Sequence, residues 1–176
     1  MKPGLLKDII ESLLFFSEEP LMVKDVAAIT GQNFEDVEEA LQDLNRIYAD
    51  KGGLQIIRVA GGYQMATRPE VAQYIEKMNK GGQNLRLSQA AVECLAIIAF
   101  KQPVTRVEVE AIRGVRVDKV LENLVKKKLI RITGRKNVPG RPMTYGTTKI
   151  FLKYFGLNSL DDLPPLDHFK EMQKSL

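Results

Sequence analysis

Apolar side chains recur along the first part of the chain at the period of an α-helix. They follow the spacing i, i+3, i+4, i+7 and i+8, which places them on one helix face. These residues are Leu6, Ile9, Ile10, Leu13 and Leu14. The helix is expected to end at Glu18-Glu19-Pro20, because proline restricts the residue before it and cannot continue the helical ladder.

Two further helices are predicted in the first half of the chain. A short helix should end at Thr30, since Gly31 can adopt the left-handed stop conformation. Asn33 is placed to cap the next helix, with Asp36 three residues further on to face the free amides. The apolar positions of that helix are Phe34, Val37, Leu41, Leu44 and Tyr48.

A hairpin and a closing helix complete the first half. Residues 54–59 and 63–67 have strand character and flank Gly61-Gly62, a hairpin turn signal. Pro69 suits the first turn of a helix that runs to about Met78.

The second half of the chain repeats this order of helices. Ala90–Phe100 is apolar on almost every side, which predicts a fully buried helix. Thr105 and Glu108 form a capping box for the next helix, which Gly114 ends. The third helix has a clean apolar face made of Val117, Val120, Leu121, Leu124 and Val125.

A second hairpin follows these helices. Its strands are predicted at 129–133 and 143–147, joined by a long tip at 134–142, and a fourth helix at 148–155 should stop at Gly156. Three helices with a trailing hairpin form the winged-helix arrangement, a variant of helix-turn-helix.

The two halves also align directly. Pro20–Gly31 matches Pro103–Gly114 at an offset of 83 residues, and the same offset places Leu41 on Leu124. Such self-similarity indicates a duplicated unit. We predict a mainly α fold with small β-hairpins (α+β), built of two tandem winged-helix domains. The expected boundaries are 1–80 for the first domain, 81–86 for a linker, 87–157 for the second domain and 158–176 for a flexible tail.

Groups able to carry catalysis or bind a metal are scarce. The one histidine, His168, lies in the predicted tail, where no scaffold would hold a general base. The one cysteine, Cys94, lies in an apolar helix with no histidine nearby, which favours a buried inert thiol over a nucleophile. The segment 134–141 could be mistaken for a phosphate loop, but it lacks a Lys-Ser/Thr ending and leads into a strand. We therefore predict no catalytic, cofactor-binding or metal-ligating residue, and a protein that is not an enzyme.

The same features point to the cytoplasm. No apolar stretch approaches the roughly 20 residues needed to cross a bilayer. Asp8 and Glu11 interrupt the segment that follows Lys2 and Lys7, which argues against a secretory signal. A single cysteine allows no internal disulfide and fits a reducing compartment.

Charge is divided unevenly between the halves. Residues 1–83 carry 9 Lys or Arg against 13 Asp or Glu, a net charge of −4, and residues 84–176 carry 17 against 9, a net charge of +8. Only the second half would be drawn to a polyanion by long-range attraction.

A winged helix that reads DNA lays its third helix in the major groove, so that helix must tolerate phosphates. In the first copy the third helix is too acidic for this, and either protein contact or a solvated acidic face explains it. Its carboxylates are Glu35, Asp36, Glu38, Glu39, Asp43 and Asp50. In the second copy the third helix and wing are basic, which leaves weak non-specific DNA contact, an acidic protein partner or a solvated surface open. The basic residues are Arg113, Arg116, Lys119, Lys126, Lys127, Lys128, Arg131, Arg135, Lys136 and Arg141.

Two sets of residues are candidates for binding. Small domains are marginally stable alone, and the first, whose acidic helix frees it from DNA contact, is the better candidate for self-association. The self-association set is Leu13, Phe16, Pro20, Leu21 and Tyr63. The partner-binding set lies in the second domain, where arginines on a stiff wing tip can grip carboxylates or phosphates bidentately. It consists of Arg106, Arg113, Arg116, Arg135, Lys136, Pro139, Gly140, Arg141 and Pro142.

Several strings resemble the segregation and condensation protein B family, over roughly residues 5–166. The most specific is the wing, Gly-Arg-Lys-Asn-Val-Pro-Gly-Arg-Pro-Met-Thr-Tyr-Gly-Thr-Thr at 134–148. The other strings lie at 13–21, 61–63, 96–106, 109–115, 151–157 and 160–166. Phe100, where such sequences often have tyrosine, is a mild departure.

The resemblance implies a homodimer that pairs through its N-terminal winged helix and binds a kleisin, segregation and condensation protein A. Through that kleisin it would join the structural maintenance of chromosomes (SMC) ATPase, as a nucleoid-associated accessory subunit in chromosome condensation and segregation during cell division. The resemblance implies no cofactor. The runner-up hypothesis is a winged-helix transcription regulator, which would bind operator DNA with a strongly salt-dependent, sequence-selective affinity.

Overall fold

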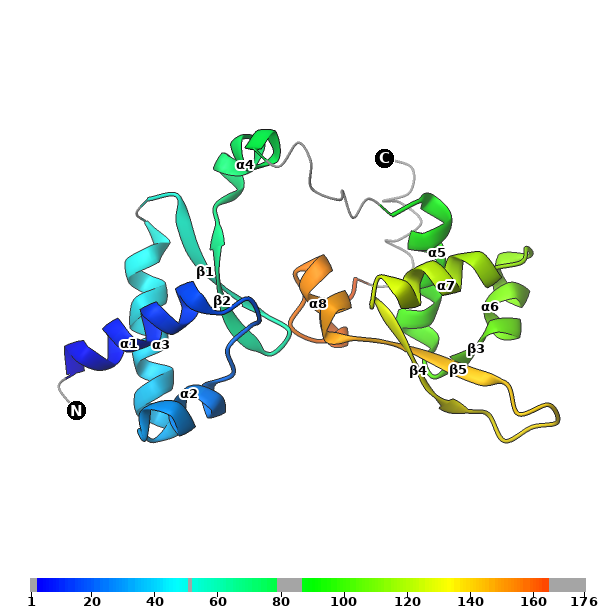
Figure 1. Cartoon of the computed structure of the whole chain (residues 1–176), viewed down its shortest axis with the longest axis horizontal. Coiled ribbons are helices and arrows are strands. Elements are labelled where there is room, and N and C mark those ends of the chain that lie inside the picture. Colours follow the sequence, from blue (N-terminus) through cyan, green and yellow to red (C-terminus); the bar gives the residue numbers. More distant parts are fainter. Residues whose placement is uncertain (1–2, 51, 79–86, 165–176) are drawn as a thin grey trace. The chain divides into compact units, whose positions relative to one another are not determined.

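The computed structural model of the chain describes residues 3–50, 52–78 and 87–164 (Figure 1). Clustering of contacts divides the chain into two compact units between Gln83 and Asn84. The predicted linker, 81–86, lies outside the described residues.

The first unit is a three-helix assembly with a hairpin and a closing helix. Its elements are α1 (Pro3–Phe16), α2 (Val23–Thr30), α3 (Phe34–Ala49), β1 (Leu54–Val59), β2 (Gly62–Thr67), the short 3-10 helix η1 (Pro69–Val71) and α4 (Ala72–Met78). The strands β1 and β2 pair antiparallel, with Val59 opposite Gly62 at the turn. This order confirms the winged-helix prediction for the first half.

Local signals fixed the helix ends of the first unit. Gly31 adopts the left-handed conformation, with φ of 67°, directly after α2. The Asn33 side chain accepts a hydrogen bond of 2.7 Å from the Asp36 amide at the start of α3. Both predicted caps are therefore confirmed.

The core of the first unit uses one face of each helix. Its buried hydrophobic residues are Leu6, Ile10, Leu14, Val26, Val37, Ala40, Leu41, Leu44, Ile56 and Tyr63. The prediction that Phe34 belongs to the apolar face of α3 is wrong, since its side chain is 54% exposed. Phe34 is the first residue of α3, where the helix has only begun and Val37 is the first position to reach the core.

The second unit repeats the plan with an added strand. Its elements are α5 (Gln89–Lys101), β3 (Val104–Thr105), α6 (Arg106–Arg113), α7 (Asp118–Lys126), β4 (Ile130–Arg135), β5 (Met143–Thr147), α8 (Lys149–Phe155) and the 3-10 helix η2 (Leu160–Asp162). The sheet has the order β3-β5-β4, with both neighbours antiparallel to β5. The capping box of Thr105 and Glu108 and the left-handed stops at Gly114 and Gly156 are as predicted. The two-residue strand β3 was not predicted, because it is too short to show an alternating pattern.

Helix α5 is buried on one side rather than on all sides. Ala91, Cys94, Leu95, Ile98 and Ala99 are buried in the core, where α6, α7 and β5 pack against the helix. The remaining residues of 90–100 are only half-buried. The prediction of a fully buried helix is therefore wrong within this unit, because its neighbours cover only part of the circumference.

Residues 158–164, the first part of the predicted tail, contain η2 and contact the second unit. The Ser159 side chain caps η2, and the Asp162 carboxylate accepts hydrogen bonds from the amides of Asn158 and Ser159 at 2.8 and 3.1 Å. Leu163 packs against the core of the second unit. The rest of the predicted tail, 165–176, including His168, lies outside the described residues.

The turn of the first hairpin depends on a close approach between two backbones. Leu21 and Tyr63 exchange two backbone hydrogen bonds, of 2.8 and 2.9 Å, which join the chain before α2 to β2. A Cβ atom on Gly62 would lie 2.7 Å from the Leu21 carbonyl oxygen. Only glycine allows this approach.

We expect Gly62→Ala to lower the free energy of unfolding by about 1–3 kcal/mol, because the added methyl group must push two backbone segments apart. Gly53→Ala is the matched control, since its nearest neighbour would be a Val71 methyl group 4.0 Å from the new Cβ. Urea unfolding followed by circular dichroism measures both. Equal stability of the two variants would contradict the role assigned to Gly62.

Candidate functional site

Helix α1 is apolar on two sides. One side contributes Leu6, Ile10 and Leu14 to the core. On the other side Phe15 and Phe16 are 79% and 87% exposed, and Leu5 is exposed as well. Large apolar side chains that gather on a surface mark a site of association more often than those scattered singly.

The exposed side of α1 borders a shallow groove of about 960 Å³, here called the α1 groove. Its lining is mostly apolar and comes from α1, α3, β1 and β2. The residues are Leu5, Asp8, Ile9, Glu11, Ser12, Leu13, Phe15, Phe16, Tyr48, Leu54 and Met65. Tyr48 donates a hydrogen bond to the Glu11 carboxylate, and this bond raises the pKa of the tyrosine. The Tyr48 hydroxyl and the Glu11 carboxylate, two polar groups of the groove, are therefore hydrogen-bonded to each other.

The predicted self-association residues fall into two groups. Leu13 and Phe16 line the α1 groove. Leu21 and Tyr63 form the backbone bridge between the chain before α2 and β2, and Pro20 beside them is half-buried. The Tyr63 hydroxyl donates to the Glu38 carboxylate at 2.8 Å, and burial raises its pKa. These last three residues thus contribute to the internal structure of the unit.

Sequence reasoning missed Phe15, Leu5 and the strand residues of the α1 groove. The signal for the first two was present: α1 has apolar residues at 15 and 16, and at 5, outside its single core stripe. Leu54 and Met65 joined the groove only through the fold, because both lie in the hairpin, far along the chain from α1.

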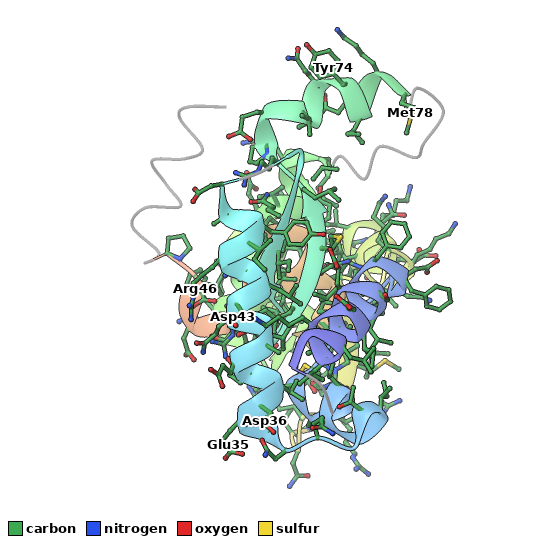
Figure 2. All side chains as sticks on the ribbon, turned by 90° about the vertical axis from the view of Figure 1, so that its left-hand side faces the viewer. Glu35, Asp36, Asp43, Arg46, Tyr74 and Met78 are labelled. Atoms are coloured by element: carbon green, nitrogen blue, oxygen red, sulfur yellow. The ribbon has the colours of Figure 1, made fainter. Side chains whose placement is uncertain are left out.

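The carboxylates of α3 lie along the exposed part of that helix, where Figure 2 labels Glu35, Asp36 and Asp43. Asp43 forms ion pairs with Lys7 at 2.5 Å and with Arg46 at 3.3 Å. The hydrogen bond from Lys7 lowers the pKa of Asp43. Even after this compensation, the helix that would enter a DNA groove is anionic.

Figure 2 also labels Tyr74 and Met78, two exposed residues of α4.

The wing tip of the second unit has a defined backbone. The amide of Lys136 donates to the Pro142 carbonyl at 2.9 Å, and the amide of Arg141 donates to the Val138 carbonyl at 2.9 Å. Gly140 takes a left-handed φ of 81° between them, and Arg135 donates to the Arg141 carbonyl at 3.0 Å. Pro139 and the residues from 135 to 141 are exposed. The structure therefore brings most of the predicted partner-binding residues together at one end of the hairpin.

Lys136 links this wing tip to α6. Its ammonium group forms an ion pair with the Glu108 carboxylate, which also accepts a hydrogen bond of 2.9 Å from the Thr105 amide. The bond from Lys136, and after it the bonds from Thr105, lower the pKa of Glu108 to about 2. The carboxylate is therefore ionised over the ordinary range of pH, and the ion pair is formed throughout it.

The three remaining arginines of the partner-binding set have different surroundings. Arg106 bridges Glu110 at 3.2 Å and Asp118 at 2.9 Å. Arg113 is only 15% exposed, pairs with Glu93 at 2.8 Å and donates to the Ala90 carbonyl at 2.8 Å, so it ties α6 to α5. Arg116 is exposed in the turn between α6 and α7. Of the three, Arg116 alone is left without an ion pair to a described residue.

A second, smaller groove lies between α7 and the wing, with a volume of about 260 Å³. Its apolar residues include Val125, Ile132 and Tyr145, and charged residues stand at its edge. Val125 was expected in the core but is partly exposed here. The apolar part of this lining suits a protein side chain better than a phosphate.

Catalytic and metal-binding groups do not gather within the described residues. No group of three or more His, Cys, Asp or Glu residues there could hold a metal ion. Cys94 is buried, and burial raises the pKa of its thiol, although the Arg113 guanidinium lies 3.3 Å from the sulfur. None of the helices in the described part of the chain is long and apolar enough to span a membrane.

We expect Arg113→Ala to destabilise the second unit by about 1–3 kcal/mol, because the change leaves a half-buried carboxylate and a carbonyl without their donor. Arg116→Ala, three residues away, should change the free energy of unfolding by no more than about 0.5 kcal/mol. Chemical unfolding of both variants measures the difference. If the two variants are equally stable, the contacts of Arg113 with Glu93 and the Ala90 carbonyl do not stabilise the unit.

Comparison with known proteins agrees with the resemblance found in the sequence. The family model described as segregation and condensation complex subunit ScpB matches residues 8–166. Segregation and condensation protein B of Clostridium perfringens (strain SM101) is 48% identical over 172 residues, which cover 97% of this chain and 88% of that protein.

Two solved structures are also similar to the chain. The structure of ScpB from Mycobacterium tuberculosis is 34% identical, with 89% of this chain and 98% of that chain covered and a TM-score of 0.44. A dimer of an ScpB N-terminal domain in complex with an ScpA peptide is 26% identical, with 43% of this chain and 95% of that chain covered and a TM-score of 0.40. With the match of its sequence to the family model and to relatives of similar length, this chain belongs to the ScpB family of segregation and condensation complex subunits.

Proposed function

We propose that the chain is a non-enzymatic accessory subunit of an SMC–kleisin complex that acts in chromosome condensation and segregation during cell division. The observation that carries this proposal is the family match over residues 8–166, which spans both winged-helix units. The proposal includes a cytoplasmic location and association with the nucleoid. Its runner-up, a transcription regulator, lacks comparable support, because the third helix of the first unit is anionic.

The α1 groove supports a homodimer formed by the first unit. In a twofold dimer both copies present the same surface, so each exposed phenylalanine of one copy can meet the groove of the other. Burying a phenylalanine side chain contributes roughly 1.5–3 kcal/mol, whereas association costs an estimated 4–15 kcal/mol. Phe15 and Phe16 alone would therefore give a weak dimer, and the rest of the apolar groove must be covered as well.

The wing tip is the surface proposed for the kleisin. Arg135 and Arg141 stand on a backbone held by hydrogen bonds, so little conformational entropy is lost when they bind. Their guanidinium groups suit carboxylates of an acidic kleisin segment, which they can grip with two hydrogen bonds each. Pro139, Gly140 and Pro142 of the same tip, and the exposed Arg116 of the turn between α6 and α7, remain in the proposed set, whereas the paired Arg113 does not. Lys136 and Arg106 are already held by carboxylates of their own unit.

We expect the double variant Phe15→Ser, Phe16→Ser to be monomeric at concentrations where the wild-type chain is dimeric. The free energy of unfolding of the monomer should change little, because both side chains are exposed. Size-exclusion chromatography with light scattering measures the mass. Phe34→Ser, at another exposed phenylalanine of the same unit, should stay dimeric. A wild-type chain that is monomeric at high concentration would overturn the dimer.

Purification of the tagged chain from its own cells should recover a kleisin and a large coiled-coil ATPase, identified by mass spectrometry. The Arg135→Ala, Arg141→Ala variant should recover much less of both, while its own dimerisation is unchanged. A chain that is recovered alone, and binds one defined operator sequence, would overturn the proposed function in favour of a regulator.

A further inference from the structure

A second basic surface lies at the base of the β4–β5 hairpin, at the opposite end of β4 from the wing tip. It is formed by the end of α7, the start of β4 and the start of α8. Its members, here called the basal cluster, are Lys126, Lys127, Lys128, Arg131 and Lys149.

Backbone contacts bring these residues into one region. The Thr148 hydroxyl donates to the Lys128 carbonyl at 2.6 Å, which places Lys149, the first residue of α8, beside the end of the α7 segment. Three residues beyond Lys128, Arg131 lies opposite Gly146 in the sheet. Cations from three separate elements therefore lie in one region of the fold, with Lys127 half-buried at its edge beside α5, and only the fold brings Lys149 there.

The charge of the basal cluster is not compensated within the described part of the chain. Three cations elsewhere in the same unit, Arg106, Arg113 and Lys136, are each paired with a carboxylate, whereas Arg116 and the wing-tip arginines are not paired with a described residue. None of the five basal side chains forms an ion pair with a described residue, not even Lys126 with Glu122 one turn earlier in α7. Residues 87–164 carry 14 Lys or Arg against 7 Asp or Glu, so the surplus is concentrated on such unpaired groups.

Fold stability accounts for only some of these positions. Lysines at the end of α7 suit the negative end of that helix, which explains Lys126 and Lys127. Lys128, however, has a φ of +57°, a left-handed conformation for which glycine is the favoured residue. Lys149 stands at the first position of α8, where the helix dipole disfavours a cation, and the first turn of α8 has no acidic residue. Two of the five residues thus occupy places that their backbone disfavours.

We propose that the basal cluster binds the phosphate backbone of duplex DNA without reading its sequence. Four of the five cations are lysines, which act on phosphate as point charges, and none is an Asn or Gln of the kind that reads base edges. Protein–DNA interfaces are far more positively charged than protein–protein interfaces, whose energy comes largely from Trp, Tyr and Arg anchors, and the cluster has a single arginine. No aromatic residue belongs to the cluster. The inference goes beyond the proposed function, which assigns dimerisation to the α1 groove and the kleisin to the wing tip.

The salt dependence of duplex binding by the full chain tests the proposal. Fluorescence anisotropy of a short labelled duplex of arbitrary sequence is measured between about 25 and 200 mM salt. If four or five phosphates are contacted, the logarithm of the affinity should fall against the logarithm of the salt concentration with a slope of about −4. The triple variant Lys126→Ala, Lys127→Ala, Arg131→Ala should flatten that slope by about 2 to 3.

Two further variants separate binding from folding and from the wing. Lys128→Gly relieves the left-handed backbone, so it should flatten the slope by about 1 while the Tm stays the same or rises. Arg135→Ala, Arg141→Ala removes charge from the wing tip and should leave the slope unchanged. The proposal would be overturned if the wild-type chain did not bind the duplex at the lowest salt. It would also be overturned if the wing-tip variant flattened the salt slope as much as the basal variants do. Equally tight binding of a polyglutamate peptide would likewise overturn the proposal and would point to an acidic protein segment instead. The basal variants should still recover the kleisin from cells, which keeps this test separate from that of the proposed function.

Discussion

The first unit depends on how α1 divides its apolar side chains. A winged helix of this size has one core, and the core takes Leu6, Ile10 and Leu14 from one side of the helix. Among the described residues of the unit, none covers the opposite side, so Phe15 and Phe16 are exposed and border an open groove. This exposure is unfavourable in the isolated chain, and burial of these side chains in the proposed dimer would offset it. The helix that supplies three residues to the core is thus also the one whose other side is left open to a partner.

Charged side chains divide in the same way: some have a partner of their own unit, and others have none among the described residues. In the first unit the Asp43 carboxylate is held by Lys7 and Arg46, and Glu38 by Tyr63. In the second unit Arg113 and Lys136 tie α6 to its neighbours. The groups left over differ in sign between the units, carboxylates on α3 and cations at the wing tip and hairpin base. Each unit therefore offers a different surface to its surroundings, although the two share one fold.

Local chemistry made most of the fold predictable from the sequence. Caps such as Asn33 and the box of Thr105 with Glu108 depend on residues three positions apart, and Gly114 needs only its own backbone conformation. The features that were missed depend on distant contacts. Leu163 orders the segment after α8 by packing on a core that lies far back along the chain, and nothing in its own neighbourhood signals this.

The binding residues were harder to predict for a related reason. Arg113 and Arg116 look alike in the sequence, but Arg113 meets Glu93 and a carbonyl of α5 while Arg116 extends from a turn. Whether an arginine stabilises the fold or remains available to a partner depends on which carboxylate the fold places beside it. Composition identifies a basic domain, and the pairing of charges in three dimensions decides which part of that domain can bind. By this criterion Lys149, which has no ion pair with a described residue and lies at the unfavourable end of a helix dipole, carries more functional information than Arg113 or Lys136, which are paired.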